Sequence, residues 1–289
     1  MTYGIPADQP QQEVPVCPRH TDRVSYVRCQ RCGRPACPEC QRPAAVGIQC
    51  VDCVRENART APTQRTIFGG VARQGKPILT FSIIGVCAVL FLLQMVTPGL
   101  TGALAYAPLY TSEYLPPEPW RMLTAAFLHS TGFLLHIAFN MYALWLMGQA
   151  LEPLLGRTRF LALYLLSALG GSVAVLLLSN PLQSVVGASG AVFGLFGAML
   201  VVQRRRGGDV RQLVVLIAIN GVLGFVVPGI SWQAHLGGLL AGASAAAIIA
   251  YAPKGKNRSL IHWGGLAGLA VVLIALTILG ASLVQLPVG

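Results

Sequence analysis

Residues 78–97 read ILTFSIIGVCAVLFLLQMVT, a run of twenty residues without a charged side chain. A helix needs roughly 20 apolar residues to cross the hydrocarbon core of a bilayer, because it rises only about 1.5 Å per residue. The whole chain continues this pattern, since 54% of its 289 residues are hydrophobic and only 11% are charged. A soluble domain carries about 25% charged residues. The sequence therefore predicts an all-α polytopic membrane protein.

Working outward from this run, the rest of the chain is a series of apolar segments with short polar breaks. A cluster of three arginines at 204–206 cuts the fourth segment short. We predict a core of six membrane helices followed by one further C-terminal membrane helix. The seven predicted spans are residues 78–97, 122–148, 160–179, 188–202, 212–228, 233–251 and 262–285.

The basic residues indicate how these spans are oriented. If every predicted span crosses the bilayer, 20 of the 21 Lys and Arg side chains lie on one side, and Arg121 is the exception. Basic loops stay in the cytoplasm, which predicts a cytoplasmic N-terminus and an extracytoplasmic C-terminus. We expect the membrane to be the plasma membrane. The net charge of +11 is thus a topology signal, and we expect no nucleic-acid partner.

The first 77 residues are polar, and no apolar run among them is long enough for a secretory signal peptide. Seven of the eight cysteines fall within them, between Cys17 and Cys53. The predicted domains are a disordered N-terminus at 1–15, a metal-binding module at 16–54, a linker at 55–77, the six-helix core at 78–252, and the seventh helix with the C-terminus at 253–289.

The cysteines of this module occur in pairs at zinc-binding spacing. Each pair is separated by two residues and suits two corners of a tetrahedral zinc site, so four pairs predict two structural zinc ions. One zinc with spare cysteines is an alternative; disulfides are a weaker one, because cytoplasmic thiols stay reduced. The four predicted ligand pairs are Cys17 and His20, Cys29 and Cys32, Cys37 and Cys40, and Cys50 and Cys53.

The order of these pairs resembles a B-box-type zinc finger. The resemblance implies a cross-braced module in which pairs one and three share one ion and pairs two and four share the other. The last pair here is Cys50 and Cys53, where that family usually has histidines. No coordination position is left open for catalysis, so we expect a structural module, with a cytoplasmic docking partner as one possible role.

Three predicted membrane spans begin with polar residues that suit catalysis. Ser189 begins the fourth span, His235 begins the sixth, and His136 and Asn140 lie near the start of the second. These spans all run from outside to inside, which places the four residues at one depth. A serine and a histidine suffice for nucleophilic acyl transfer, and two donors spaced i, i+4 can hold an oxyanion.

Each of these residues also has a simpler interpretation. A serine in a membrane helix is usually an interhelical hydrogen-bond partner, whereas a membrane histidine is rarer and more often functional. None of the ten acidic residues lies inside a predicted span, so no triad acid is expected there and a Ser–His dyad remains. Glycines at 190, 194, 238 and 242 would let the fourth and sixth spans pack closely.

Together these motifs resemble those of rhomboid intramembrane serine proteases, over about residues 78–252. The resemblance implies Ser189 as nucleophile, His235 as general base, and His136, Asn140 and the Ser189 N–H as oxyanion donors. It also implies that the Phe193 ring packs on the catalytic histidine. The implied substrates are single-pass membrane proteins, which would enter beside the fifth span. The residues that carry the resemblance are Trp120, Arg121 and Thr124, His136 and Asn140, the Gly-Ala-Ser-Gly motif of 187–190, and Ala234, His235, Gly238 and Gly242.

His129 precedes His136 by seven residues, two more than is usual in rhomboids, and is not included in the predicted site. No cofactor is expected for the chemistry.

Two alternative functions belong to other classes of protein. One is a catalytically silent rhomboid-like protein that binds membrane helices, against which the Ser–His pair argues. The other is a small transporter with a zinc sensor, against which the lack of a membrane-embedded acid argues.

Overall fold

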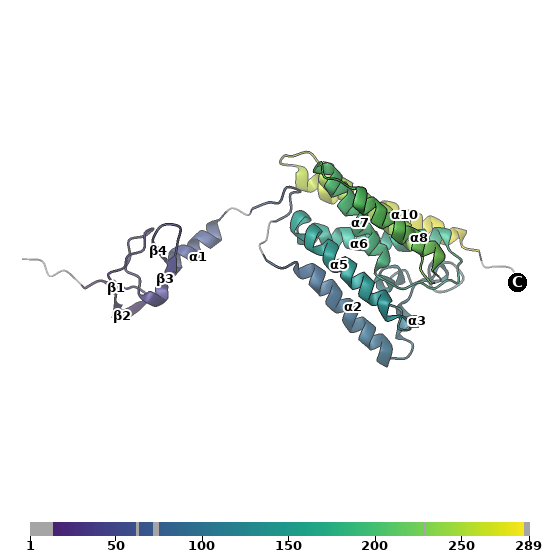
Figure 1. Ribbon diagram of the computed structural model, residues 1–289, viewed down its shortest axis with the longest axis horizontal. Coiled ribbons are helices and arrows are strands. Elements are labelled where there is room, and N and C mark those ends of the chain that lie inside the picture. Colours follow the sequence, from purple (N-terminus) through teal and green to yellow (C-terminus); the bar gives the residue numbers. More distant parts are fainter. Residues whose placement is uncertain (1–13, 62–63, 72–74, 228, 286–289) are drawn as a thin grey trace, which may run out of the picture. The chain divides into compact units, whose positions relative to one another are not determined.

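A computed structural model describes residues 14–61, 64–71, 75–227 and 229–285. The chain divides into two compact units, residues 1–63 and residues 64–289, and each is described by itself (Figure 1). The segment predicted to be disordered, residues 1–15, falls almost entirely outside the described residues.

The N-terminal unit consists of short elements around the cysteines. Two antiparallel strand pairs, β1–β2 and β3–β4, bring the ligand turns together. Cysteine side chains form most of its buried core, which is typical of a module too small to fold on apolar contacts alone. Its elements are β1 (Val16–Cys17), β2 (His20–Val24), η1 (Pro38–Cys40), β3 (Gln41–Pro43), β4 (Ile48–Cys50) and α1 (Val51–Thr60).

Helix α1 and the residues after it differ from the predicted linker at 55–77. The helix continues to Thr60 because it starts directly after a ligand cysteine, Cys50, and contains good helix formers. Residues 64–71 then belong to the second unit, where Phe68 is buried in the hydrophobic core. A turn at 66–70 is closed by hydrogen bonds between Thr66 and Gly70.

The second unit is all-α and membrane-spanning. Among its described residues, five helices are long and apolar enough to cross a bilayer, namely α2, α5, α6, α9 and α10. The shorter α7 and α8 complete the set of seven predicted spans. The predicted fold class is therefore confirmed. The helices are α2 (Ile78–Val96), α5 (Leu134–Leu155), α6 (Arg157–Leu178), α7 (Ser189–Arg205), α8 (Arg211–Val226), α9 (Trp232–Tyr251) and α10 (Arg258–Leu283).

Helix α5 is shifted from its predicted span, 122–148. Residues 121–127 instead form two short turns, α4 (Arg121–Thr124) and η3 (Ala125–Phe127), and α5 runs on past Glu152 to a glycine at 156 with φ of +80°. The prediction that no acidic residue lies inside a span is thus wrong for Glu152. This buried carboxylate accepts hydrogen bonds from the backbone of Leu79 and Thr80, so it caps the N-terminus of α2 instead of facing lipid.

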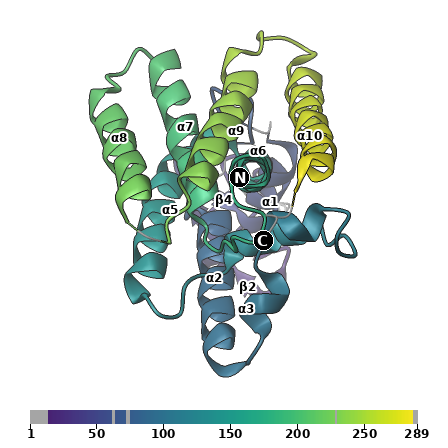
Figure 2. The same cartoon turned by 90° about the vertical axis from the view of Figure 1, so that its right-hand side faces the viewer.

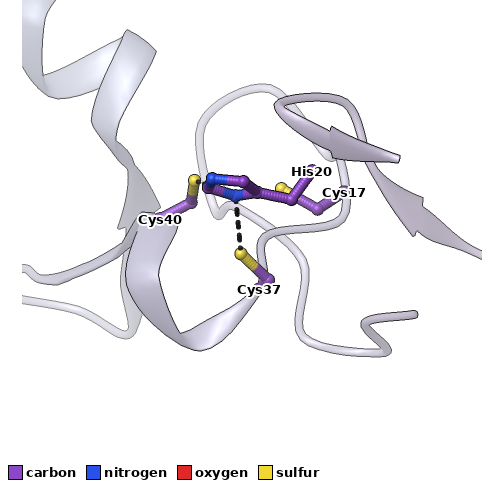
Figure 3. A group of neighbouring side chains, drawn as sticks. All are labelled: Cys17, His20, Cys37 and Cys40. Carbon is purple, nitrogen blue, oxygen red and sulfur yellow. Dashed lines mark hydrogen bonds between the residues drawn. The ribbon is translucent and has the colours of Figure 1, made fainter. Parts of the chain in front are cut away.

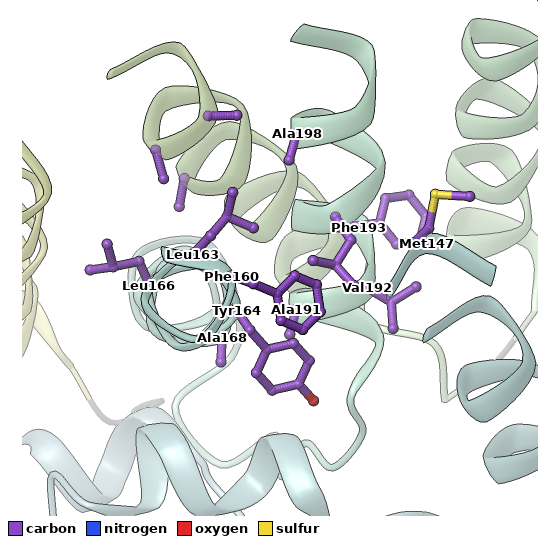
Figure 4. Close-up of a cluster of buried hydrophobic side chains, with 14 of the residues drawn as sticks. Met147, Phe160, Leu163, Tyr164, Leu166, Ala168, Ala191, Val192, Phe193 and Ala198 are labelled. Carbon is purple, nitrogen blue, oxygen red and sulfur yellow. The ribbon is translucent and has the colours of Figure 1, made fainter. Parts of the chain in front are cut away.

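Helices α6, α7 and α9 form the centre of the membrane unit (Figure 2). Gly190 faces Gly238, and Gly194 faces Gly242, so α7 and α9 run parallel in close contact. A Cβ at Gly238 would overlap the carbonyl oxygen of Gly190. Helix α6 runs antiparallel to both, with Gly171 beside Gly190 of α7 and Gly170 beside Gly237 of α9. Figure 4 shows buried side chains that α6 and α7 contribute to the same hydrophobic core. Small residues allow this approach, because membrane helices associate through close packing.

Candidate active site

Ser189 is the first residue of α7 and is partly exposed. The first N–H groups of a helix have no partner within it and carry a partial positive charge, so the backbone at Ser189 can stabilise an anion. The preceding Gly187 has a φ of +139°, a conformation that favours glycine. Its N–H donates to the carbonyl oxygen of Ala125 at 2.9 Å, which fixes the approach to the helix.

His235 lies on α9 and is 7% exposed. Its ring stacks on that of Phe193, with centroids 3.9 Å apart and 10° between the planes. The ring Nδ1 is buried and has no hydrogen-bond partner in the described part of the chain, so no described carboxylate holds it. The described contacts thus hold the ring by stacking on Phe193 and not by a hydrogen bond to Nδ1.

Close helix contacts place Ser189 and His235 at the same level. A Cβ at Gly190, next to Ser189, would lie 3.2 Å from the carbonyl oxygen of Ala234, next to His235. Phe193, one turn after Ser189, is the residue that stacks on His235. Among the described side chains no hydrogen bond joins Ser189 to His235. The hydrogen bonds close to them are made by His136 and Asn140. Catalytic hydrogen bonds are often longer before substrate binds.

The ring of His136, on α5, faces the space beside the Ser189 hydroxyl. Its Nδ1 accepts a hydrogen bond from the Ser130 N–H at 3.2 Å, so the neutral ring carries its proton on Nε2. A Cβ at Gly187 would lie 2.9 Å from that Nε2 and 3.6 Å from the Ser189 Oγ. The two atoms therefore border one small space, and Nε2–H is available there as a donor.

Asn140 follows His136 by one helical turn and is 8% exposed. Its Nδ2 donates to the carbonyl oxygen of His136 at 2.8 Å. An amide nitrogen has two protons, so the second remains available to a ligand.

His129 belongs to this cluster although the sequence analysis left it out. It is fully buried, and its ring packs edge-on against that of His136, with centroids 5.3 Å apart. Gln94 of α2 holds its backbone at both the N–H and the carbonyl. The residues between the two histidines loop back at Gly132 instead of continuing the helix, so spacing alone did not indicate this contact.

Comparisons with known proteins identify the domain that contains these residues. Residues 116–252 match the family model described as the rhomboid domain. This chain belongs to the rhomboid family. It is 36% identical over 224 residues to rhomboid protease GluP of Bacillus subtilis, which covers 74% of this chain and 42% of that protein. It is 39% identical over 133 residues to RHOMBOID-like protein 5 of Arabidopsis thaliana, 43% of this chain and 42% of that protein.

A third relative is rhomboid protease GlpG of Yersinia pestis. It is 32% identical over 190 residues, which are 63% of this chain and 66% of that protein. The chain thus spans less than two thirds of the length of each of these three rhomboid relatives. Helices α2 and α10 and the N-terminal unit lie outside the residues matched to the rhomboid domain model.

The Trp-Arg motif of the rhomboid domain organises the loop before α5. Arg121 is 7% exposed, and its guanidinium donates to the carbonyl oxygens of Gly102 and Ala105. It also pairs with Glu118 and lies 3.9 Å above the Tyr110 ring. Arg121, the only basic side chain predicted on the outer side, is therefore buried in contacts within the protein and not exposed to solvent. A guanidinium suits this position because it can donate to several acceptors at once.

Helix α8 also lies next to His235. A Cβ at Gly224 would lie 3.6 Å from His235 Nδ1. Phe225 of α8 stacks on Trp232 at the start of α9, with centroids 4.9 Å apart. At 16 residues, α8 is about 24 Å long, shorter than a hydrocarbon core of roughly 30 Å.

The cysteine-rich module, outside the rhomboid domain, contains two groups of potential metal ligands. Within each group the ligand atoms all lie within 4.8 Å of one another, as the corners of a metal tetrahedron do. The cross-braced pairing implied by the B-box resemblance is confirmed. Figure 3 shows the first group, which is Cys17, His20, Cys37 and Cys40; the second is Cys29, Cys32, Cys50 and Cys53.

The chemistry of both groups suits a metal cation. The backbone N–H of Cys37 leads the contacts that lower the pKa of Cys17 to about 6. Burial raises the pKa of Cys29, but backbone donors led by Cys50 outweigh it and lower this pKa to about 6 as well. Each group thus holds a cysteine that ionises readily, and the thiolate is the form that binds metal.

Proposed function

We propose that this protein is an intramembrane serine endopeptidase that cleaves other membrane proteins within or beside a membrane helix. The observation that carries the proposal is the stacking of Phe193 on His235 beside the glycine contact of α7 with α9. It supports a Ser189–His235 dyad at one level of the bundle. The rhomboid protease relatives support the same activity.

In this proposal Ser189 Oγ attacks the carbonyl carbon of the scissile peptide bond while His235 Nε2 takes the serine proton. The negative charge on the carbonyl oxygen is stabilised by the Ser189 N–H, His136 Nε2–H and Asn140 Nδ2–H. His235 then returns the proton to the leaving amine, and water hydrolyses the acyl-enzyme by the same route. Ser189 is partly exposed, so a peptide and then water can reach it.

We also propose that the two cysteine clusters bind zinc. Seven thiolates and one imidazole favour zinc over calcium or magnesium, which prefer oxygen ligands. Both ions are structural, because each cluster supplies four ligands and leaves no position for substrate. The module then offers a folded surface to a cytoplasmic partner.

The orientation of the chain is part of the same proposal. Basic residues gather where α6, α8 and α10 begin and α7 ends. By the positive-inside rule this end faces the cytoplasm, and the N-terminus lies there too. Ser189 and His235 lie near the starts of α7 and α9, at the end of the bundle away from the basic residues. The proposed site therefore opens toward the extracytoplasmic side of a plasma membrane.

The proposal is tested by incubating tagged single-pass membrane proteins with the wild-type protein and with Ser189→Ala in detergent or proteoliposomes. We expect cleavage by the wild type and none by Ser189→Ala. Ser82→Ala, which removes an exposed hydroxyl from α2, is the matched control and retains activity. Cleavage by Ser189→Ala at the wild-type rate would remove the nucleophile assignment. Substrate capture without cleavage by the wild type would favour a silent membrane-helix binder.

A further inference from the structure

A cavity of about 450 Å³ lies at the end of the membrane unit opposite Ser189. Its walls are the start of α6, the connection from α9 to α10, and the turn at 65–69. None of its lining residues is acidic. Five of them are basic: Arg65, Arg159, Lys254, Lys256 and Arg258.

Carboxylates of the residues that the structure describes do not neutralise these basic side chains. In the described ranges none of the five lies in an ion pair. Arg159 is only 5% exposed and donates through Nε to His262 Nδ1 at 2.9 Å. Arg258 donates to the carbonyl oxygen of Ile67. Like charges held together without a counter-charge repel one another, so an anion bound among them would be stabilised.

Two buried N–H groups beside the cavity also lack acceptors. Since His262 Nδ1 accepts from Arg159, the neutral ring carries its proton on Nε2. That Nε2 and the Nε of Arg258 are buried without a hydrogen-bond partner in the part of the chain described. A Cβ at Gly69, which lines the cavity, would lie 3.4 Å from each of these two side chains. Of these two residues only Arg258 lines the cavity. Buried donors are normally paired, so the Arg258 guanidinium is suited to bind an acceptor there.

The turn that completes the cavity is firmly attached to the membrane unit. Phe68 is 4% exposed within the hydrophobic core. A Cβ at Gly70 would overlap the carbonyl oxygen of Leu155, so the backbone of the turn lies directly on the end of α5. Arg65 is thereby placed across from Arg159 and Arg258 without any rearrangement.

We propose that this cavity binds a phosphate group. A phosphate offers several acceptor oxygens and negative charge, which match guanidinium and ammonium donors. The cavity lies where apolar helices end, at the level of lipid headgroups, and basic pockets at this level bind anionic headgroups. The phosphate can belong to an anionic phospholipid or to a soluble phosphate. This inference does not depend on the proposed protease activity.

The test is calorimetric titration of the full-length protein in detergent at physiological ionic strength. The probes are short-chain phosphatidylglycerol, short-chain phosphatidylcholine and inorganic phosphate. The variant is Lys254→Gln/Lys256→Gln, whose side chains are exposed at the rim. The matched control is Arg204→Gln/Arg206→Gln, which removes the same charge from exposed positions at the same end of the unit but outside the cavity.

We expect phosphatidylglycerol to bind more tightly than phosphatidylcholine. The lysine variant loses two basic side chains that contribute ~1 kcal/mol each near a headgroup, so it should bind about 30-fold more weakly, and the arginine control should bind as the wild type does. Binding of inorganic phosphate alone, with the same loss in the lysine variant, supports the site with a soluble ligand. Equal losses in both variants, or no binding of either anionic probe to the wild type, would overturn the proposal.

Discussion

The ring of Phe193 lies flat on the ring of His235, with 3.9 Å between their centroids. The two residues come from parallel helices, α7 and α9, that are joined by glycine contacts above and below. In the proposed Ser189–His235 dyad no described acidic residue orients the imidazole, and this stack would take the place that a carboxylate has in a triad. The relationship predicts that the aromatic ring affects turnover more than substrate binding.

Replacing Phe193 with Leu should lower kcat about 3- to 10-fold and leave KM nearly unchanged, because an aromatic pair contributes ~0.5–1.5 kcal/mol beyond burial. Steady-state cleavage of a model substrate measures both constants. Phe196→Leu is the control, since Phe196 is equally buried and contacts Phe193 edge-on. Similar kinetics of the two variants would show that the Phe193 ring serves packing alone.

Replacing Asn140 with Ala should lower kcat by ~10- to 1,000-fold, because one oxyanion donor of a serine protease contributes about that much to turnover. Asn220→Ala is a close match: its Nδ2 also donates to the carbonyl oxygen four residues earlier, at 2.8 Å, but it lies on α8. We expect the control to keep the wild-type kcat. Parallel losses of binding and turnover in Asn140→Ala would instead indicate a structural role.

Replacing Gly238 with Ala should destabilise the membrane unit by about 1–3 kcal/mol, the usual cost of forcing a methyl group into a filled core. The new Cβ would meet the backbone of Gly190, which cannot move aside as a side chain can. Thermal unfolding in detergent measures the change. At Gly85 of α2 a Cβ would meet nothing within 4 Å, so Gly85→Ala should melt at or above the wild-type temperature. Equal melting of both variants would disprove the close contact.

Removing the metal should unfold the N-terminal unit and leave cleavage intact. The unit has little core besides its cysteines, and thiolates without zinc have no other source of stability. A chain that begins at Gln64 keeps the turn that packs on the membrane unit and should still cleave a model substrate. Its cleavage rate is compared with that of Cys29→Ser/Cys32→Ser in the full chain. If both lose activity while the membrane unit still melts cooperatively, the zinc module is coupled to catalysis.

Much of this architecture follows from local features of the sequence. Long uncharged runs such as 78–97 can only be stable in a bilayer as helices, and six of the seven predicted spans lie within a few residues of the observed helices. Four ligand pairs at fixed spacing predict two groups of four potential metal ligands, and the structure forms both. Such features are determined by composition and spacing, because they depend on neighbours along the chain.

Tertiary structure decided the features that join distant segments. Glu152 lies inside α5 because the N-terminus of α2, some seventy residues earlier, needs a cap. His129 reaches His136 only because the chain folds back between them. The basic cavity combines Arg65, Arg159 and Arg258, which the sequence shows only as separate topology signals. Such contacts depend on how the helices are packed, and side-chain patterns along one helix do not contain that information.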